Sequence, residues 1–186
     1  WDSATKYFKK TLELDPKATG SLLNLGVMSR KLKKYDDAIK YYLGVLAIDS
    51  THAWASNNIA NIYSIREDYD KAEFYYKLAI KYDSLYHLAI CNLAKQYESL
   101  KEYPKALKLY HQSKSIEPYY EDNYFGLGNV HYKTANYDSA VLYYYFCTLL
   151  DSTHAINYYN LGNAYKMKKD KENAIYYYKK AYKADS

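Results

Sequence analysis

Residues Tyr158-Tyr159-Asn160-Leu161-Gly162-Asn163-Ala164-Tyr165 contain a pattern that returns along the whole chain and predicts its fold. The Leu161-Gly162 pair recurs every 34 residues toward the N-terminus, as leucine or isoleucine followed by glycine or alanine. One alanine and one tyrosine position keep the same step. The recurring positions are Leu25-Gly26, Ile59-Ala60, Leu93-Ala94 and Leu127-Gly128; Ala38, Ala72, Ala106, Ala140 and Ala174; and Tyr42, Tyr76, Tyr110, Tyr144 and Tyr178.

A period of this length is typical of stacked helical hairpins, none of which can bury its apolar face alone. In the second full repeat, apolar residues fall at helical spacing over 57–63 and 72–80, and the polar turn 66–68 separates the two stretches. The sequence therefore predicts an all-α solenoid of antiparallel helix pairs. An acidic residue or proline favours a helix start, which predicts that second helices begin at Tyr35-Asp36, Tyr69-Asp70, Tyr103-Pro104 and Tyr137-Asp138.

The composition agrees with a packed helical protein that has no special chemistry. Of the 186 residues, 49% are hydrophobic and 28 are tyrosines, which we interpret as packing residues of the helix–helix seams. The net charge of +5 is mild, and no run of like charges indicates nucleic-acid binding. We expect Cys91 and Cys147 to be reduced and buried. No apolar stretch is long enough to span a membrane, and no signal peptide is visible, so cytoplasmic is the default expectation for location.

The last repeat adds Ala174, Tyr178, Ala181 and Asp185 to residues 158–165, and it resembles the tetratricopeptide repeat. The resemblance covers the whole chain and implies a right-handed superhelical α-solenoid, with a concave groove lined mainly by the first helices. Members of this family mostly bind peptides or partner proteins there and are rarely enzymes. Departures are the absent turn glycine and His131, which stands at a tyrosine position. The resemblance divides one array into residues 1–18, the second helix of a preceding repeat, full repeats 19–52, 53–86, 87–120 and 121–154, and a last repeat 155–186, truncated by two residues.

Asparagine recurs at two positions of the first helices, although it is a mediocre helix former. Gly126 interrupts the first row. The functional interpretation is a ladder of carboxamides that bind a peptide backbone, one rung for roughly every third residue of an extended peptide. The alternative is that these side chains bond to the neighbouring repeat. The first row is Asn24, Asn58, Asn92 and Asn160, and the second, one helical turn further on, is Asn61, Asn129 and Asn163.

Other expected groove positions carry aromatic and charged side chains. Five cations against two acids favour a peptide or protein ligand with some acidic character, and the aromatic side chains would anchor it. A solvated face without a ligand is the alternative. The aromatic residues are Trp54, Phe125, Tyr132 and Tyr159, the cations are Arg30, Lys31, Lys95, Lys133 and Lys166, and the acids are Glu98 and Asp122.

One subfamily can be argued against. Tetratricopeptide domains that grip the acidic tail of chaperones resemble one another in a lysine–asparagine clamp. The first clamp lysine would fall on Leu23, Asn57, Cys91, Phe125 or Tyr159, and none of these is lysine.

A second candidate surface lies on the second helix of the fourth full repeat. Leu142, Tyr145, Phe146 and Leu149 follow the spacing i, i+3, i+4 and i+7, which places them on one outward face. An exposed stripe of this size usually marks an interface. We predict a convex interface for a partner helix or a second copy of the chain. The alternative is a locally apolar helix, or one covered by another part of a parent protein. The equivalent residues are Lys6, Lys9, Lys10 and Glu13 near the start and Tyr176, Lys179, Lys180 and Lys183 near the end.

Catalytic and metal-binding interpretations are weak. The five histidines are dispersed, and none has the spacing or cysteine company of a zinc site. We expect no enzyme activity, no cofactor and no metal. Two rivals to a peptide-binding scaffold stay open. The chain can be a segment of a longer array, or a subunit that self-associates through its open ends. Binding of single-stranded nucleic acid by tyrosines and lysines is the weaker rival, because no base-reading pair recurs in each repeat.

Overall fold

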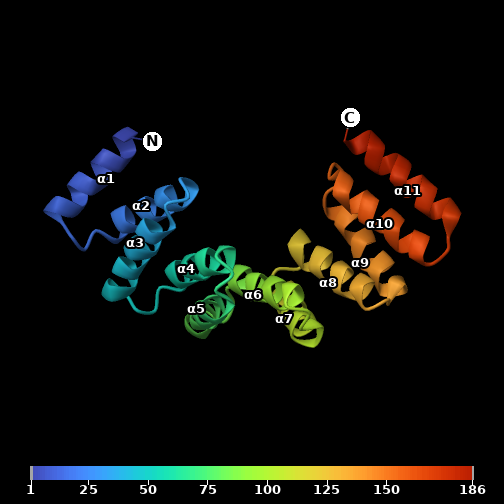
Figure 1. Ribbon diagram of the computed structural model, residues 1–186, viewed down its shortest axis with the longest axis horizontal. Coiled ribbons are helices and arrows are strands. Elements are labelled where there is room, and N and C mark those ends of the chain that lie inside the picture. Colours follow the sequence, from blue (N-terminus) through green and yellow to red (C-terminus); the bar gives the residue numbers. More distant parts are fainter. Residues whose placement is uncertain (1, 186) are drawn as a thin grey trace. The chain divides into compact units, whose positions relative to one another are not determined.

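The computed structural model describes residues 2–185, and these residues form eleven α-helices and no strand (Figure 1). The predicted all-α class is therefore confirmed. The helices are α1 (Asp2–Leu14), α2 (Thr19–Lys31), α3 (Tyr35–Ile48), α4 (Ala53–Ile65), α5 (Tyr69–Tyr82), α6 (His87–Ser99), α7 (Tyr103–Ile116), α8 (Glu121–Lys133), α9 (Tyr137–Leu150), α10 (Ala155–Met167) and α11 (Lys171–Ala184).

The chain divides into two compact halves, Trp1–Asn92 and Leu93–Ser186, and the division lies within α6. In the N-terminal half α2 packs on α3 and α4 on α5; in the C-terminal half α8 packs on α9 and α10 on α11. Every predicted repeat from residue 19 onward contains two helices. Trp1 and Ser186, the outer limits of the predicted array, lie outside the described residues. None of the described helices is long and apolar enough to cross a membrane.

The helix ends follow the local chemistry of the sequence. Second helices begin at Tyr35, Tyr69, Tyr103 and Tyr137, as predicted. Three residues just before such helices cap them, because their side-chain oxygens accept a bond from the backbone N–H three residues on. These caps are Asp68, Asn136 and Asp170, with N···O distances of 3.3, 3.4 and 3.1 Å. The sequence punctuation therefore places the turns of the hairpins correctly.

Small residues at the recurring Leu-Gly position let a tyrosine of the second helix approach the first helix. A Cβ atom added to Gly128 would lie 2.7 Å from Cδ1 of Tyr144, and one added to Gly162 would lie 2.7 Å from Cδ1 of Tyr178. These distances are too short for a carbon–carbon contact, so the glycines admit the rings. Ala60, at an equivalent position, is fully buried. The tight contact predicted from the repeat is thus present.

A second aromatic contact repeats in the hairpins, about one helical turn closer to the turn that joins the two helices. Parallel rings stack in three repeats, with centroid distances of 5.4–5.8 Å. The pairs are Tyr63–Tyr75, His131–Tyr143 and Tyr165–Tyr177. Burial, with a smaller effect of His111, lowers the pKa of His131, so its ring stays neutral at pH 7. The histidine that departs from the family pattern therefore preserves the stack.

Neither cysteine forms a disulfide and both are buried, as the sequence predicts. Cys91 lies in the N-terminal half and Cys147 in the C-terminal half. Burial raises the pKa of the Cys147 thiol to about 12, so this side chain stays protonated and behaves as an apolar packing residue.

The turn between the two helices of each repeat contains a residue in the left-handed region. Five such residues recur with the period of 34, and none of them is glycine. An L side chain costs about 1–2 kcal/mol in this conformation. The missing turn glycine therefore leaves local strain in each repeat. The residues and their φ angles are Lys33 (58°), Glu67 (60°), Lys101 (61°), Ala135 (60°) and Lys169 (64°).

We expect Ala135→Gly to raise the free energy of unfolding by about 1 kcal/mol, because glycine adopts this backbone conformation without the steric cost. Ala47→Gly is the matched control, since Ala47 is exposed within α3. The same chemical change there should not raise stability, because alanine adopts a helical backbone without steric cost. Urea unfolding followed by circular dichroism measures both. If Ala135→Gly lowers stability, the backbone of Ala135 is not strained.

Candidate functional site

The first asparagine row is not chemically uniform. In the N-terminal half, Nδ2 of Asn24 donates to the Gly20 carbonyl and Nδ2 of Asn58 donates to the Trp54 carbonyl, each at 2.8 Å. Both bonds stay within the asparagine's own helix. Asn160, in the C-terminal half, makes no side-chain hydrogen bond to another described residue. The asparagines of this row therefore differ in whether their side-chain amides already donate a hydrogen bond within the protein.

Asn92 joins two neighbouring first helices of the N-terminal half. Its Nδ2 donates to Oδ1 of Asn57 and to Oδ1 of Asn61, both at 3.2 Å. Asn57 is only 4% exposed, and its own Nδ2 lies 3.4 Å from the Tyr86 hydroxyl. Asn92 therefore bonds to the neighbouring repeat, which is the alternative to a peptide-binding role for this row.

The interruption at Gly126 has a steric cause in the C-terminal half. A Cβ atom added to Gly126 would lie 2.1 Å from Cζ of Tyr110, so this ring fills the space that an asparagine side chain would need. The Tyr110 hydroxyl donates to Oε2 of Glu98 at 2.7 Å. The buried carboxylate of Glu98 therefore holds the ring against Gly126. The repeat pattern alone does not indicate this contact.

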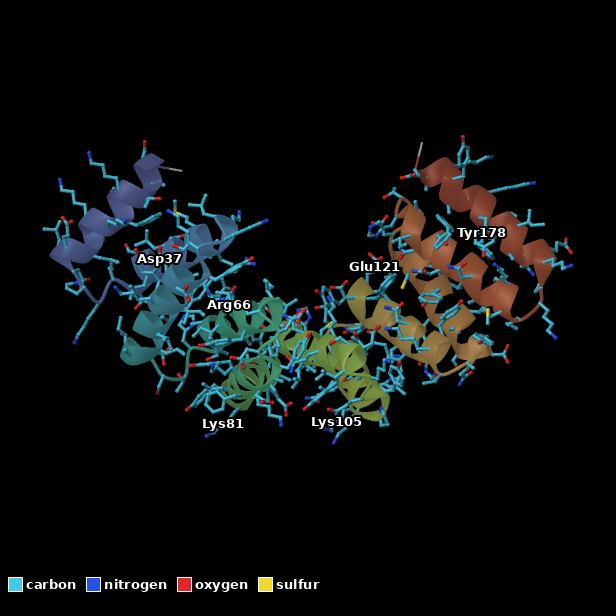
Figure 2. The ribbon with its side chains drawn as sticks, viewed as in Figure 1. Asp37, Arg66, Lys81, Lys105, Glu121 and Tyr178 are labelled. Carbon is cyan, nitrogen blue, oxygen red and sulfur yellow. The ribbon has the colours of Figure 1, made fainter. Side chains whose placement is uncertain are left out.

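The second asparagine row is uniform in its main contact. Each member accepts, through Oδ1, a hydrogen bond from the tyrosine hydroxyl 15 residues later on the second helix of the same repeat. Tyr178 lies on α11, on the side that faces α10 (Figure 2). Burial raises the pKa of all three hydroxyls, so they stay protonated donors at neutral pH. The pairs are Tyr76–Asn61 (2.7 Å), Tyr144–Asn129 (2.8 Å) and Tyr178–Asn163 (2.8 Å).

Two predicted groove cations form ion pairs within the C-terminal half. Nζ of Lys95 lies 2.8 Å from Oδ2 of Asp122, and Nζ of Lys133 lies 2.8 Å from Oε1 of Glu98. Burial acts to raise the pKa of Asp122, but hydrogen bonds from Lys95 and Tyr120 hold it below its usual value. These two lysines therefore link α6 to α8, which limits their use in binding a ligand.

The predicted groove aromatics divide into packed and exposed side chains. Phe125 and Tyr132 are half-buried against the cluster around Ala140, Tyr144 and Leu161. Tyr159 is 50% exposed, and Trp54, in the N-terminal half, is 37% exposed. Trp54 meets the Tyr42 ring edge-on, with a centroid distance of 5.8 Å. Tyr159 likewise meets the Tyr178 ring, with a centroid distance of 5.8 Å, but leaves the larger exposed fraction for a ligand.

The C-terminal half contains a hollow that joins three predicted groove residues. Its volume is about 730 Å³, and α10 and α11 form its walls. Tyr159, Asn163 and Lys166 lie along the α10 wall. The lining is completed by Ala155, Ile156, Tyr178, Ala181, Tyr182 and Asp185.

The predicted convex stripe is exposed on α9. Leu142 is 51% exposed, Tyr145 43%, Phe146 39% and Leu149 59%. Phe146 also contacts the ring of Tyr124 on α8, at a centroid distance of 5.4 Å. Four large apolar side chains therefore share one solvent-facing surface.

Three side chains that no sequence motif links come together in the C-terminal half. Donor atoms of Glu121, Asp151 and His154 lie within 4.8 Å of one another. Oε1 of Glu121 already accepts from Nδ2 of Asn157 at 2.8 Å, and Oδ1 of Asp151 accepts from Thr153. The repeat register could have indicated this contact, because Glu121 and the first residue of α10 are 34 positions apart. We interpret the cluster as a link between the starts of α8 and α10.

These helix pairs and their period define an α-helical repeat protein. Tetratricopeptide-repeat models match residues 18–84 and 155–186, together just over half of the chain. The chain therefore belongs to the tetratricopeptide-repeat family, whose members generally act as non-enzymatic scaffolds for protein–protein interaction. No curated protein matches the sequence.

Solved structures agree on the fold. A crystal structure of MamA is 22% identical, with 90% of this chain and 91% of that chain covered and a TM-score of 0.78. YrrB, described as a tetratricopeptide-repeat protein with an unusual peptide-binding site, is 21% identical, with coverage of 95% and 91% and a TM-score of 0.74. A tetratricopeptide-repeat protein from Parabacteroides merdae ATCC 43184 is 18% identical, with coverage of 98% and 72% and a TM-score of 0.80. At these identities the likeness concerns the fold alone.

Measurements of stability can distinguish the structural roles of Asn92 and Asn160, which both belong to the first asparagine row. We expect Asn92→Ala to lower the free energy of unfolding by about 1–3 kcal/mol, because it removes a donor from the buried Oδ1 of Asn57. Asn160→Ala, the matched control, should change stability by no more than about 0.5 kcal/mol. Urea unfolding measures both. Equal effects would mean that the two asparagines have the same structural role.

Proposed function

We propose that the chain is a non-enzymatic interaction scaffold that holds an extended peptide or partner segment against the first helices of its C-terminal half. The hollow of about 730 Å³ between α10 and α11 carries this proposal, because Tyr159, Asn163 and Lys166 line it together. Its size is within the usual range for ligand pockets, and it offers an aromatic surface, an amide and a cation. YrrB, with the same fold, is described with a peptide-binding site.

Each tyrosine–asparagine pair prepares an amide for such a ligand. The Tyr178 hydroxyl occupies Oδ1 of Asn163, and Nδ2 of Asn163 has no acceptor among the described residues. A backbone carbonyl of an extended segment would supply that acceptor. Asn129, held by Tyr144, offers a second Nδ2 on α8.

The N-terminal half is less suited to this role. Asn24 and Asn58 donate to their own helices, and Asn92 donates to Asn57 and Asn61. A ligand would have to compete with these bonds. We therefore place the main binding surface on α8 and α10.

Selection of a random peptide library displayed on phage tests the proposal. We expect peptides to be enriched, and the best of them to bind roughly tenfold more weakly to Asn163→Ala, measured by fluorescence anisotropy. Tyr178→Phe should weaken binding roughly threefold in the wild type and not at all in the Asn163→Ala background, because the hydroxyl acts through that amide. Tyr177→Phe is the control, since its ring stacks on Tyr165. No enrichment, or unchanged affinity for Asn163→Ala, would contradict the proposal.

The exposed stripe Leu142, Tyr145, Phe146 and Leu149 supports a second interface on α9. The stripe has no charged side chain, so two copies can meet there without repulsion. We therefore propose that this convex surface pairs with a second copy of the chain. This interface is separate from the hollow, whose lining contains no residue of α9.

Sedimentation velocity over a range of concentrations tests the convex interface. We expect a concentration-dependent dimer that the double variant Tyr145→Lys, Phe146→Lys abolishes, because each dimer would then bury four charges in an apolar contact. Circular dichroism should show unchanged helix content, because both side chains are at least 39% exposed. A wild type that stays monomeric, or a dimer that survives the double variant, would exclude this interface.

A further inference from the structure

The positive charge of the chain is concentrated in its last repeat. Residues 155–186 contain seven lysines and three acidic residues, a net charge of +4, whereas the whole chain has +5. The other repeats are therefore almost neutral as a group. A negatively charged partner that approaches the chain meets its strongest attraction at α10 and α11.

Within the C-terminal half, Lys166 is the predicted groove cation that stays available. Lys95 and Lys133 are ion-paired with Asp122 and Glu98, while Lys166 makes no ion pair with another described residue. Lys166 lines both the hollow described above and an adjoining one that contains Lys169 and Lys171. One end of the groove on α10 is thus cationic.

The other end of the hollow has the opposite character. Ile156 and Tyr159 lie toward the start of α10, and Tyr182 and Asp185 come from the end of α11, which runs back alongside α10. Ile156 is 42% exposed and Tyr182 is 78% exposed, so this end offers apolar surface. Asp185 disfavours a second acidic group there. The hollow is therefore polarised along the α10 axis.

The distance between the apolar and cationic ends of the hollow along α10 sets how far apart the matching ligand residues must be. From Tyr159 or Ile156 to Lys166 the helix rises about 10–15 Å. An extended peptide covers this distance with about three to five residues. Asn163 lies between the two ends, and its oriented Nδ2 can bond the backbone of the ligand midway.

We infer that the last repeat selects an extended segment with an acidic side chain about three to five residues from a large apolar one. The acidic group pairs with Lys166, and the apolar group packs on Ile156, Tyr159 and Tyr182. This inference rests on the proposed function and adds to it the chemistry and the direction of the ligand. Asp185 fixes the direction, because it repels the acidic end.

The test is a parallel phage selection of a random peptide library on the full chain and on Lys166→Glu. We expect the wild type to enrich aspartate or glutamate at a fixed distance from leucine or an aromatic residue, and Lys166→Glu to lose this preference. The best wild-type peptide should bind Lys166→Ala roughly tenfold more weakly. Lys179→Ala is the charge-matched control, because Lys179 does not line this hollow. Its effect on affinity should be less than about twofold.

The outcomes separate this inference from the proposed function. Peptides that depend on Asn163 but show no acidic preference, or that bind Lys166→Ala and Lys179→Ala equally, would overturn the inference and leave the scaffold function standing. Failure to enrich any peptide would overturn both. Acidic residues enriched on both sides of the apolar residue would contradict the direction that Asp185 sets.

Discussion

The close approach of a tyrosine from the second helix to a small residue of the first helix is the contact on which the rest depends. Gly128 and Gly162 leave no space for a Cβ atom beside the rings of Tyr144 and Tyr178. Because the ring is fixed there, its hydroxyl reaches the same asparagine position in each of three repeats. The packing that closes the hairpin therefore also sets the orientation of a surface amide. Fold and candidate site share one cause.

The sequence predicts what the period controls and misses what neighbouring residues control. The helices, their starts at Tyr35 or Tyr69, and the tight contacts at glycine or alanine follow from the repeat alone. The hydrogen bonds of the asparagine side chains do not follow from the repeat. Asn58 bonds to its own helix and Asn92 bridges two repeats, although both occupy one position of the repeat. A carboxamide takes whichever partner lies nearest, and that partner changes from repeat to repeat.

The charged residues show the same limit of prediction from the sequence. Counting groove residues gives an excess of cations, but only the structure shows that Lys95 and Lys133 are held by Asp122 and Glu98. Each of these pairs joins α6 to α8 and so supports the stack. An ion pair that links helices lowers the net attraction for a ligand at that place. The lysine that remains available, Lys166, lies where the sequence concentrates its positive charge.

A repeat array allows this division of roles because its stability is nearly a sum of contacts between neighbours. Residues outside the hairpin seam can change in one repeat without disturbing the others. The N-terminal half uses Asn92 and Asn57 to join its repeats, whereas the last repeat leaves Asn160 and the Nδ2 of Asn163 unbonded to other described residues. Both side chains are half-buried, and an amide donor without a protein partner contributes little to folding. On α10, beside Lys166, they are the donors that the proposed ligand would use.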